Sequence, residues 1–279
     1  MNIHLTTVAG SFVQVLPHML SHYRELGITS FFVNVHLSHD KDVILGEVQE
    51  ITNRFGCGIA SVLIGDWQSN LVEMYARSRR LYPNDWFILA DQDELQVYPH
   101  DLIEIIKECD RKGYDYISGS FVDRISADGG FPEVDPDRDV WSQFPLGGFV
   151  SYPMLGADPR KVVAAKGHVK LVRGQHVALS GVSCPIGEYF IQVHHFKWVK
   201  DLVSRLARRS QILKGSNVPH WVESERFVSY FEKHGGRIDI NDPQFRLTKC
   251  DRDYKYWDDI RHKAINFLSS RSAARKQVK

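Results

Sequence analysis

The chain of 279 residues predicts an α/β fold, with a mainly parallel central sheet flanked by helices. Two observations predict it. Apolar runs of strand length alternate with segments of helical periodicity throughout residues 1–122. Glycine or proline often marks the boundary, as Gly27 and Pro83 do. Strands and helices that alternate at this spacing form parallel βαβ units, an architecture typical of nucleotide binding.

The individual elements follow from their residue types. β-branched and aromatic residues dominate the expected strands, and apolar residues recur at helical spacing in the expected helices. We expect strands at residues 3–8, 30–35, 59–64, 86–90 and 114–121. We expect helices at residues 13–26, 42–55, 70–81 and 101–109.

The pattern changes after this first half. Residues 123–159 are rich in proline and glycine, which predicts a long irregular segment, and long loops in compact domains are commonly functional. Beyond it we expect strands at residues 161–165, 169–173, 177–179 and 189–193, and a basic helix at 198–213. We predict one domain over residues 1–215, in two halves that meet at residue 122, and a helical extension over 216–279.

Composition excludes several classes of protein. A formal net charge of +1 argues against a nucleic-acid binder that relies on bulk electrostatics. The N-terminus lacks a signal-peptide pattern, and no apolar stretch approaches the roughly 20 residues that span a bilayer, so we expect a cytoplasmic protein. The cysteines lie far apart without a Cys-x-x-Cys pair, which favours reduced thiols.

The most informative motif ends the strand that begins at Trp86, where Asp91-Gln-Asp93-Glu94 places three carboxylates within four residues. Crowded carboxylates repel one another unless a cation holds them. In an extended segment, Asp-x-Asp would place both side chains on one side, where they can share a Mg²⁺ or Mn²⁺ ion completed by substrate phosphates. We predict Asp93 as the main metal ligand, with Asp91 bridging to the metal or to a ribose, and Glu94 supporting them. The alternative is a strand end with solvated carboxylates.

Two adjacent histidines form a second candidate. Alternation along the preceding strand should point His194 and His195 to opposite faces, so one can enter a site while the other packs. Imidazole is an acceptable ligand for Mn²⁺. We predict His195 as a metal ligand, with a purely structural histidine as the alternative.

Two residues are candidates for a general base. His176 follows Gly174, whose freedom permits a turn that presents an imidazole with an ordinary pKa near 6.5. Asp123, at the end of an inner strand, could abstract a proton or bind acceptor hydroxyls, or equally pair with Arg124 or Lys197. A buried, satisfied histidine is the alternative for His176.

The basic helix carries cationic residues beside an apolar face. These are Lys197, Lys200, Arg205, Arg208, Arg209 and Lys214. Apolar residues at helical spacing predict an ordinary amphipathic surface helix. The alternative is a cationic face for a diphosphate, a phospholipid-linked molecule or an anionic membrane surface.

On these residues the chain resembles family 2 type glycosyltransferases with a GT-A fold, in a branch with Asp-x-Asp-Glu after an apolar strand. The resemblance runs from Thr6 to about Arg209. Supporting markers are the 16–27 segment, Asp85-Trp86, Asp123-Arg124, Phe144-Pro145, Gly174-Gln175-His176 and His195-Phe196-Lys197. One departure is the lack of a Glu-Asp pair that would supply the base, which leaves Asp123, His176, Asp158 and Glu188 as alternatives.

The resemblance implies a metal-dependent hexosyltransferase that moves a sugar from a nucleotide-diphosphate donor, with a UDP-sugar as first expectation, to a hydroxyl of a glycan or lipid-linked acceptor. Inversion is the expected stereochemistry, and bacterial polysaccharide biosynthesis is the expected setting. The expected metal is Mn²⁺ or Mg²⁺ on Asp91, Asp93 and His195. The residues expected to bind the donor are Thr7, Val8, Asn34, Asp66 and Asp91.

The same resemblance gives the outer segments a role. Trp141 and Phe144 would supply an aromatic platform for a sugar, in a loop that folds over the donor. The basic helix at 197–214 would provide peripheral contact with the inner membrane face.

Two alternatives compete. A phosphohydrolase of the haloacid-dehalogenase kind also places Asp-x-Asp after an apolar strand, with the first Asp as nucleophile, but Leu95 stands where that motif has Thr or Val. A carbohydrate- or nucleotide-binding module without turnover is the other. The sequence leaves the sugar, the nucleotide base and the acceptor open.

Overall fold

The computed structural model describes residues 1–39, 43–155, 159–214 and 220–266. In chain order the elements are β1 (Ile3–Ala9), α1 (Leu16–Glu25), β2 (Ser30–Leu37), α2 (Ile44–Arg54), β3 (Ile59–Ile64), α3 (Trp67–Leu81), β4 (Trp86–Leu89), β5 (Glu94–Val97), α4 (Leu102–Arg111), β6 (Tyr116–Ile125), α5 (Val140–Gln143), β7 (Leu146–Gly148), α6 (Ser151–Leu155), β8 (Arg160–Lys166), η1 (Arg173–Gln175), β9 (Ile191–His195), α7 (Leu202–Leu213), α8 (His220–Lys233), η2 (Pro243–Phe245) and β10 (Thr248–Lys249).

Across the described residues, ten strands form one sheet in the order β10-β7-β6-β8-β4-β1-β2-β3, with β9 joining β5 to β6. β1 pairs in parallel with β2 and β4, and β2 pairs in parallel with β3. β6 also pairs in parallel with β9, whereas β7, β8 and β10 form antiparallel pairs. The predicted α/β class, with a parallel core, is therefore confirmed.

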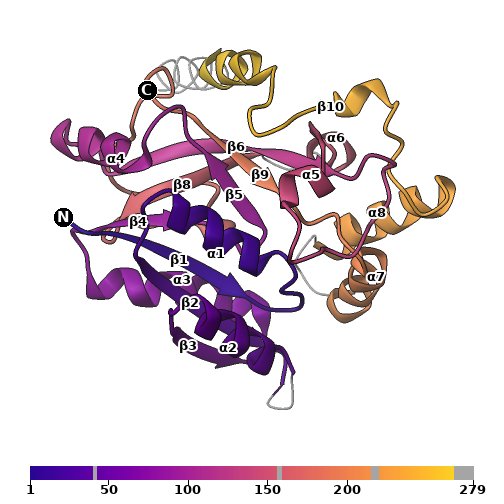
Figure 1. Cartoon of the computed structure of the whole chain (residues 1–279), viewed down its shortest axis with the longest axis horizontal. Coiled ribbons are helices and arrows are strands. Elements are labelled where there is room, and N and C mark those ends of the chain that lie inside the picture. Colours follow the sequence, from indigo (N-terminus) through magenta and orange to yellow (C-terminus); the bar gives the residue numbers. More distant parts are fainter. Residues whose placement is uncertain (40–42, 156–158, 215–219, 267–279) are drawn as a thin grey trace, which may run out of the picture.

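Helices cover the parallel strands because alternate residues of each strand face opposite sides. Leu5 and Ala9 of β1 belong to the main core together with α1 and α2, whereas Val8 packs against Met74 and Tyr75 of α3. Figure 1 shows α1 in front of the sheet and α7 and α8 side by side at one end of the molecule. Strands that are buried on both faces explain the continuous apolar runs of the sequence.

The elements predicted up to residue 121 are confirmed within a few residues, but the later ones differ. The expected strands at 169–173 and 177–179 are wrong: only a single bridge joins Leu171 to Ala178. Between these residues Gly174 and Gln175 have positive φ angles of 78° and 60°, which turn the chain and prevent an extended strand. The 123–159 segment is more regular than expected, since it contains α5, β7 and α6.

The expected aromatic platform is also wrong. Trp141 and Phe144 are 7% and 0% exposed, and both rings pack edge-on against Phe196. The buried guanidinium of Arg124 donates to the carbonyl oxygens of Phe144 and Cys250, at 3.0 and 2.7 Å. These bonds fix the segment in the core, where it cannot fold over a ligand.

Residues 220–266 pack against the rest of the described chain. β10 pairs with β7, and Phe227 and Phe231 of α8 share a core with Trp198. The division at residue 215 stays a prediction. All four cysteines are free thiols, as expected. In the described part of the chain, no helix has the length and apolar character needed to cross a membrane.

The parallel pair β6–β9 positions two residues of the candidate site, because it places Asp123 opposite His195. Gly119 allows this close pairing. A methyl group on Gly119 would lie 2.2 Å from the carbonyl oxygen of Ile191 and 2.8 Å from a methyl group of Val163.

We therefore expect Gly119→Ala to lower the free energy of unfolding by about 2–3 kcal/mol, the usual cost of forcing extra volume into a packed interior. Urea unfolding would measure it. The matched control is Gly58→Ala, because a Cβ at Gly58 would meet no atom within 4 Å. Equal stability of the two variants would contradict this account of the β6–β9 pairing.

Candidate active site

The acidic motif forms a turn between β4 and β5. The backbone N–H of Glu94 donates to the carbonyl oxygen of Asp91, and the Glu94 carboxylate accepts from the N–H of Asp91, both at 3.0 Å. The prediction that Asp91 and Asp93 share one side of an extended segment is wrong, because β4 ends at Leu89 and the chain reverses to enter β5. The carboxylates consequently meet different partners.

A buried lysine forms ion pairs with two of the three carboxylates. Lys161 of β8 is 1% exposed, and its Nζ donates to Asp91 Oδ2 at 3.1 Å and to Glu94 Oε1 at 2.9 Å. Burial lowers the pKa of Lys161, but the two neighbouring carboxylates outweigh burial and raise it overall. Burial and the charge of Asp91 raise the pKa of Glu94 to about 7. Lys161 therefore stays charged and holds the turn in place.

Asp91 is engaged on both oxygens. Its second oxygen accepts a hydrogen bond from the hydroxyl of Tyr75 in α3. These contacts favour a positioning or ribose-binding role for Asp91 over direct metal ligation, which stays a prediction.

Asp93 and His195 come together at the mouth of the turn. His195 Nε2 lies 3.4 Å from Asp93 Oδ2, and His195 Nδ1 lies 3.7 Å from Asp123 Oδ1. The imidazole stacks on Phe121, with ring centroids 5.0 Å apart. Burial lowers the pKa of His195, but Asp93 and Asp123 outweigh it and raise the pKa to about 9.

The neighbouring histidine points to the opposite face, as expected. His194 is fully buried, packs edge-on against Trp141 at 5.1 Å and contacts Gln192 at 3.2 Å. It is a core residue, and only His195 enters the site.

Asp123 is a poor candidate for a base. Its Oδ2 accepts from the N–H groups of Val150 and Ser151, both at 2.8 Å, and its Oδ1 accepts from Trp198 Nε1 at 3.0 Å. Burial raises the pKa of Asp123, but His195 and Lys197 outweigh it and hold the pKa well below its usual range. A carboxylate with these partners holds its neighbours in place and has little tendency to take up a proton.

His176 is better suited to that role. Its Nδ1 lies 2.6 Å from the carbonyl oxygen of Arg160, so Nδ1 carries a proton. Its ring meets Phe121 edge-on at 6.1 Å, and Phe121 also contacts His195. Of the other base candidates, Glu188 pairs with Lys112 and Tyr114 at the surface, and Asp158 lies outside the described residues.

The residues expected to bind the donor differ in how far they are exposed to solvent. Asn34 is fully buried; its Nδ2 donates to the carbonyl oxygen of Thr7 at 3.0 Å, and its Oδ1 accepts from Ser61 at 2.7 Å. Thr7 and Val8 are buried beside it. Of this set, only Asp66 is well exposed, at the carboxyl end of β3, besides the partly exposed Asp91. The side chains of Thr7, Val8 and Asn34 therefore stabilise the ends of β1 and β2 from inside the protein.

The sequence prediction missed three residues of this region, namely Trp67, Lys161 and Gln92. At the end of β2 and start of α3, His36 contacts the carbonyl oxygen of Gly65 at 2.9 Å, and its ring meets Trp67, which is 38% exposed. Trp67 offers an aromatic surface beside Asp66. A tryptophan directly after a strand-ending aspartate was a usable signal.

Lys161 and Gln92 are the other omissions. The side-chain amide of Gln92 bonds both backbone groups of Gly10, at 2.8 and 3.3 Å, and so ties the turn to the end of β1. A lone lysine in the apolar run 161–165 was a signal for a buried ion pair. Gln92 carried no signal, because its partner is 82 residues away.

The side chains available as ligands decide how a metal ion would fit. Among the described residues, no three His, Cys, Asp or Glu side chains are arranged to hold a metal ion. Asp93 and His195 form a two-residue set. Mg²⁺ and Mn²⁺ usually keep waters and bind through one or two protein ligands plus substrate phosphates, so this set fits a metal that arrives with a phosphate-bearing donor.

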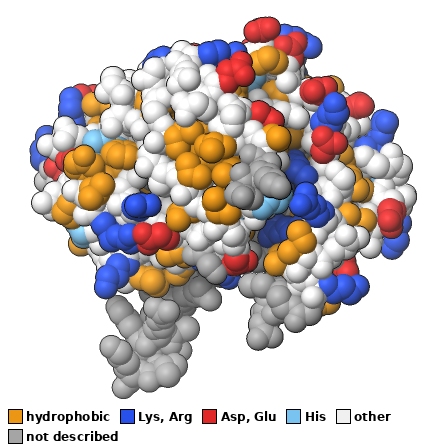
Figure 2. Space-filling model, turned by 90° about the horizontal axis from the view of Figure 1, so that it is seen from below, with side chains coloured by type: hydrophobic (Ala, Val, Ile, Leu, Met, Phe, Trp, Pro, Cys, Tyr) orange, Lys and Arg blue, Asp and Glu red, His pale blue; other side chains and the backbone are white. Residues whose placement is uncertain are grey.

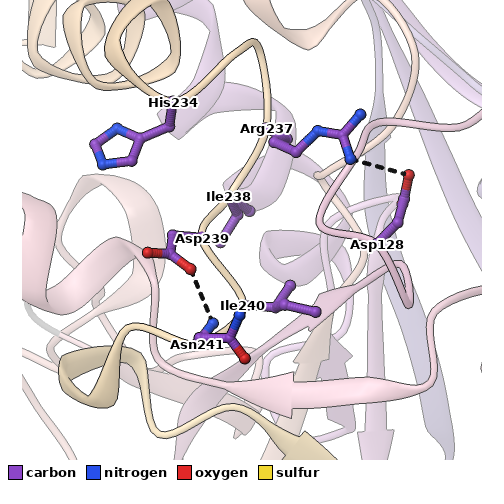
Figure 3. Close-up of a pocket in the computed structure, with 7 residues that line it drawn as sticks. All are labelled: Asp128, His234, Arg237, Ile238, Asp239, Ile240 and Asn241. Carbon is purple, nitrogen blue, oxygen red and sulfur yellow. Dashed lines mark hydrogen bonds and ion pairs between the residues drawn. The ribbon is translucent and has the colours of Figure 1, made fainter.

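A separate hollow lies away from the acidic turn. It has a volume of about 330 Å³ and is lined by Asp128 and the 234–241 segment (Figure 3). Arg237 pairs with Asp128 at 3.8 Å, and the N–H of Asn241 donates to Asp239 at 3.0 Å. Arg237 and Asp128 thus pair with each other, and Asp239 accepts from the backbone. The acidic turn remains the candidate active site.

Comparison with known proteins finds only remote likeness. No family model matches the chain, and no curated protein matches it in sequence. Among solved structures, TarS of S. aureus is 8% identical over 84% of this chain and 43% of its own, with a TM-score of 0.37. This chain thus spans less than half of that structure.

Two further structures are similar at this level. Mannosyltransferase PcManGT from Pyrobaculum calidifontis, in complex with GDP-Man and Mn²⁺, is 11% identical over 81% of this chain and 69% of its own, with a TM-score of 0.40. A putative glucose-1-phosphate thymidylyltransferase from Bacillus anthracis is 10% identical over 94% and 95%, with a TM-score of 0.31. Identities and TM-scores this low carry no conclusion about the function of this chain.

Lys161→Met should destabilise the protein by about 3–5 kcal/mol, because it leaves the carboxylates of Asp91 and Glu94 without their cation. Urea unfolding at pH 8 would measure the change, with the exposed Lys170→Met as control. Adding Glu94→Gln should restore part of the loss, since it removes a buried charge. A loss no greater than that of Lys170→Met would refute the ion-pair account.

His195 should make stability depend on pH. Because its pKa is raised from 6.5 to about 9, its stabilising effect is complete below pH 6.5 and is lost as pH rises through 9. In EDTA, the stability difference between wild type and His195→Gln should shrink by on the order of 3 kcal/mol between pH 6 and pH 10. Chemical unfolding across this range measures it, and a constant difference would rule out the assigned contacts.

Proposed function

We propose that this protein is a metal-dependent glycosyltransferase, which moves a hexose from a nucleotide-diphosphate donor to a hydroxyl of a glycan or glycolipid with inversion. The observation that carries the proposal is the pairing of Asp93 with His195 beside the carboxyl ends of the parallel strands β1 and β4. Ligands of open α/β sheets bind at this edge. The turn is held there by Gln92 and Lys161.

Asp93 and His195 would hold a Mn²⁺ or Mg²⁺ ion together with the donor's diphosphate. When bound, such an ion neutralises negative charge on the leaving diphosphate. His195 must lose its extra proton to act as a ligand, so the affinity for the metal should fall at low pH. Asp123 keeps the His195 ring oriented through its contact with Nδ1.

His176 would act as the general base. Its Nε2 accepts the proton of the acceptor hydroxyl as the oxygen bonds to the anomeric carbon. The bond between that carbon and the diphosphate oxygen breaks in the same step, and its electron pair leaves with the diphosphate. A single displacement of this kind inverts the anomeric configuration.

The nucleoside would lie over the ends of β2 and β3. Trp67 and Asp66 are exposed there, and we propose that they contact the base and ribose, with Asp91 close to the ribose. UDP-sugars remain the first donors to test. A setting in polysaccharide biosynthesis, a cytoplasmic location and membrane contact through residues 197–214 remain predictions that go with this function.

The phosphohydrolase alternative has less support. That mechanism needs Asp91 as a nucleophile, but both of its oxygens accept hydrogen bonds, from Tyr75 and Lys161. A binding module without turnover would not need the pairing of Asp93 with His195.

The test begins with a thermal-shift screen of UDP-, GDP-, CMP- and dTDP-sugars, each with Mn²⁺, Mg²⁺ or EDTA. We expect one nucleotide with Mn²⁺ to stabilise the protein, and Asp93→Asn to abolish the metal-dependent part. In the transfer assay built on that donor, His176→Gln should lower kcat by about 10²- to 10⁴-fold while donor affinity stays within about threefold.

Asp137→Asn is the control, since this exposed carboxylate lies outside the site. Stabilisation by Mg²⁺ with a phosphate mimic alone would favour the phosphohydrolase instead. Stabilisation by free sugar alone would favour the binding module. An unchanged kcat in His176→Gln would leave the transferase without its assigned base.

A further inference from the structure

Arg205 of α7 has a guanidinium group with unmet hydrogen-bonding capacity. Its Nε and Nη2 atoms are buried, and neither has a hydrogen-bond partner within the described part of the chain. The guanidinium carbon lies 3.9 Å from the ring centroid of Phe12, a cation–π contact that holds the group in place. Burying donors without acceptors costs about 1–3 kcal/mol, so the position is unfavourable unless a ligand supplies the acceptors.

Arg205 lies at the edge of the sheet that carries the acidic turn. Phe12 follows β1 and forms a bridge with Gly10, and Gly10 is the residue that Gln92 bonds on both backbone groups. Burial lowers the pKa of Arg205, and the neighbouring Asp93 carboxylate acts against this effect. The unmet donors therefore lie close enough to the proposed metal ligand Asp93 for its charge to act on them.

Two more cations reinforce this position. Lys197 lies close enough to Asp93 and Asp123 for their charges to act on it, and the charge of Arg209 acts on Lys197. Arg209 follows Arg205 by one helical turn. Figure 2 shows Lys and Arg side chains gathered in a hollow of the face seen from below, beside a histidine. Three cations whose charges act on one another or on Asp93 favour a ligand that carries more than one negative charge.

The orientation of Arg205 selects among the possible ligands of the basic helix. Arg205 turns inward onto Phe12, where a flat membrane surface cannot reach it, whereas Arg208 of the same helix is exposed. A guanidinium fork matches the paired oxygens of phosphate groups. A diphosphate ester fits both the charge and the geometry.

We propose that Arg205, assisted by Lys197 and Arg209, binds the diphosphate of the nucleotide donor directly, so that the site retains a nucleoside diphosphate without any metal. This inference rests on the proposed function, and it adds a second set of cations to the one at Asp93 and His195. The charge that the diphosphate gains when the glycosidic bond breaks would then be shared between the metal and the guanidinium.

Calorimetric titration of UDP and GDP into the protein in EDTA tests the proposal, with the nucleotide chosen by the screen above. Wild type should bind it measurably. Arg205→Gln should bind about 10- to 100-fold more weakly, the effect of losing one charge-assisted contact. Arg208→Gln, the matched control from the exposed side of α7, should stay within about twofold of wild type.

Other diphosphates distinguish the source of the ligand. Inorganic pyrophosphate should compete with the nucleotide in wild type but not in Arg205→Gln. If farnesyl diphosphate binds through Arg205 while UDP and GDP do not, the site belongs to a lipid-linked diphosphate and the nucleotide assignment is overturned.

A second measurement separates lost binding from lost folding. Because Nε and Nη2 of Arg205 have no hydrogen-bond partner among the described residues, Arg205→Gln should keep or raise the Tm of the ligand-free protein. Arg205→Lys should recover part of the affinity. Equal affinities of Arg205→Gln and Arg208→Gln in EDTA, or binding that vanishes in EDTA, would overturn this inference alone. Failure of every nucleotide to bind even with Mn²⁺ would instead count against the proposed function.

Discussion

The ammonium group of Lys161 bridges Asp91 and Glu94 inside the protein, and the geometry of the acidic turn depends on this contact. Three carboxylates within four residues would repel one another if they were buried without a cation. Lys161 reaches them from β8, which pairs antiparallel to β4. Because two of the carboxylates are thereby paired with Lys161, Asp93 is the one left to face His195.

The negative and positive charges of the candidate site come from two different parts of the chain. On one side, the sheet carries Asp93, and on the other, α7 and the segment before it carry Arg205 and Lys197. His195 lies beside Asp93, and the charges of Asp93 and Asp123 keep its imidazole protonated at neutral pH. A ligand that is anionic at one end and binds a divalent cation would satisfy both sets of charges, which is the physical basis for the proposed nucleotide-diphosphate donor.

Much of the fold could be predicted because its first half is built locally. Each βαβ unit lies within a short stretch of chain, and strands buried on both faces leave long apolar runs. The second half was harder. β5 pairs with β9, which lies about a hundred residues later. β5 itself has only four residues, too few to show the alternation of apolar and polar residues that marks a strand. The same distance hid Trp141 and Phe144, whose core position depends on Arg124 and on Cys250.

The sequence by itself determined the α/β class, the acidic motif and the two histidines as candidates, because each leaves a local pattern of residue types. The tertiary structure decided which carboxylate pairs with which cation. It showed that Asp91 is occupied by Lys161 and Tyr75, that Asp123 is saturated by hydrogen bonds, and that Arg205 turns inward. Ion pairs and hydrogen bonds depend on distances of a few ångströms between residues that are far apart in the chain, and no periodicity of the sequence encodes those distances.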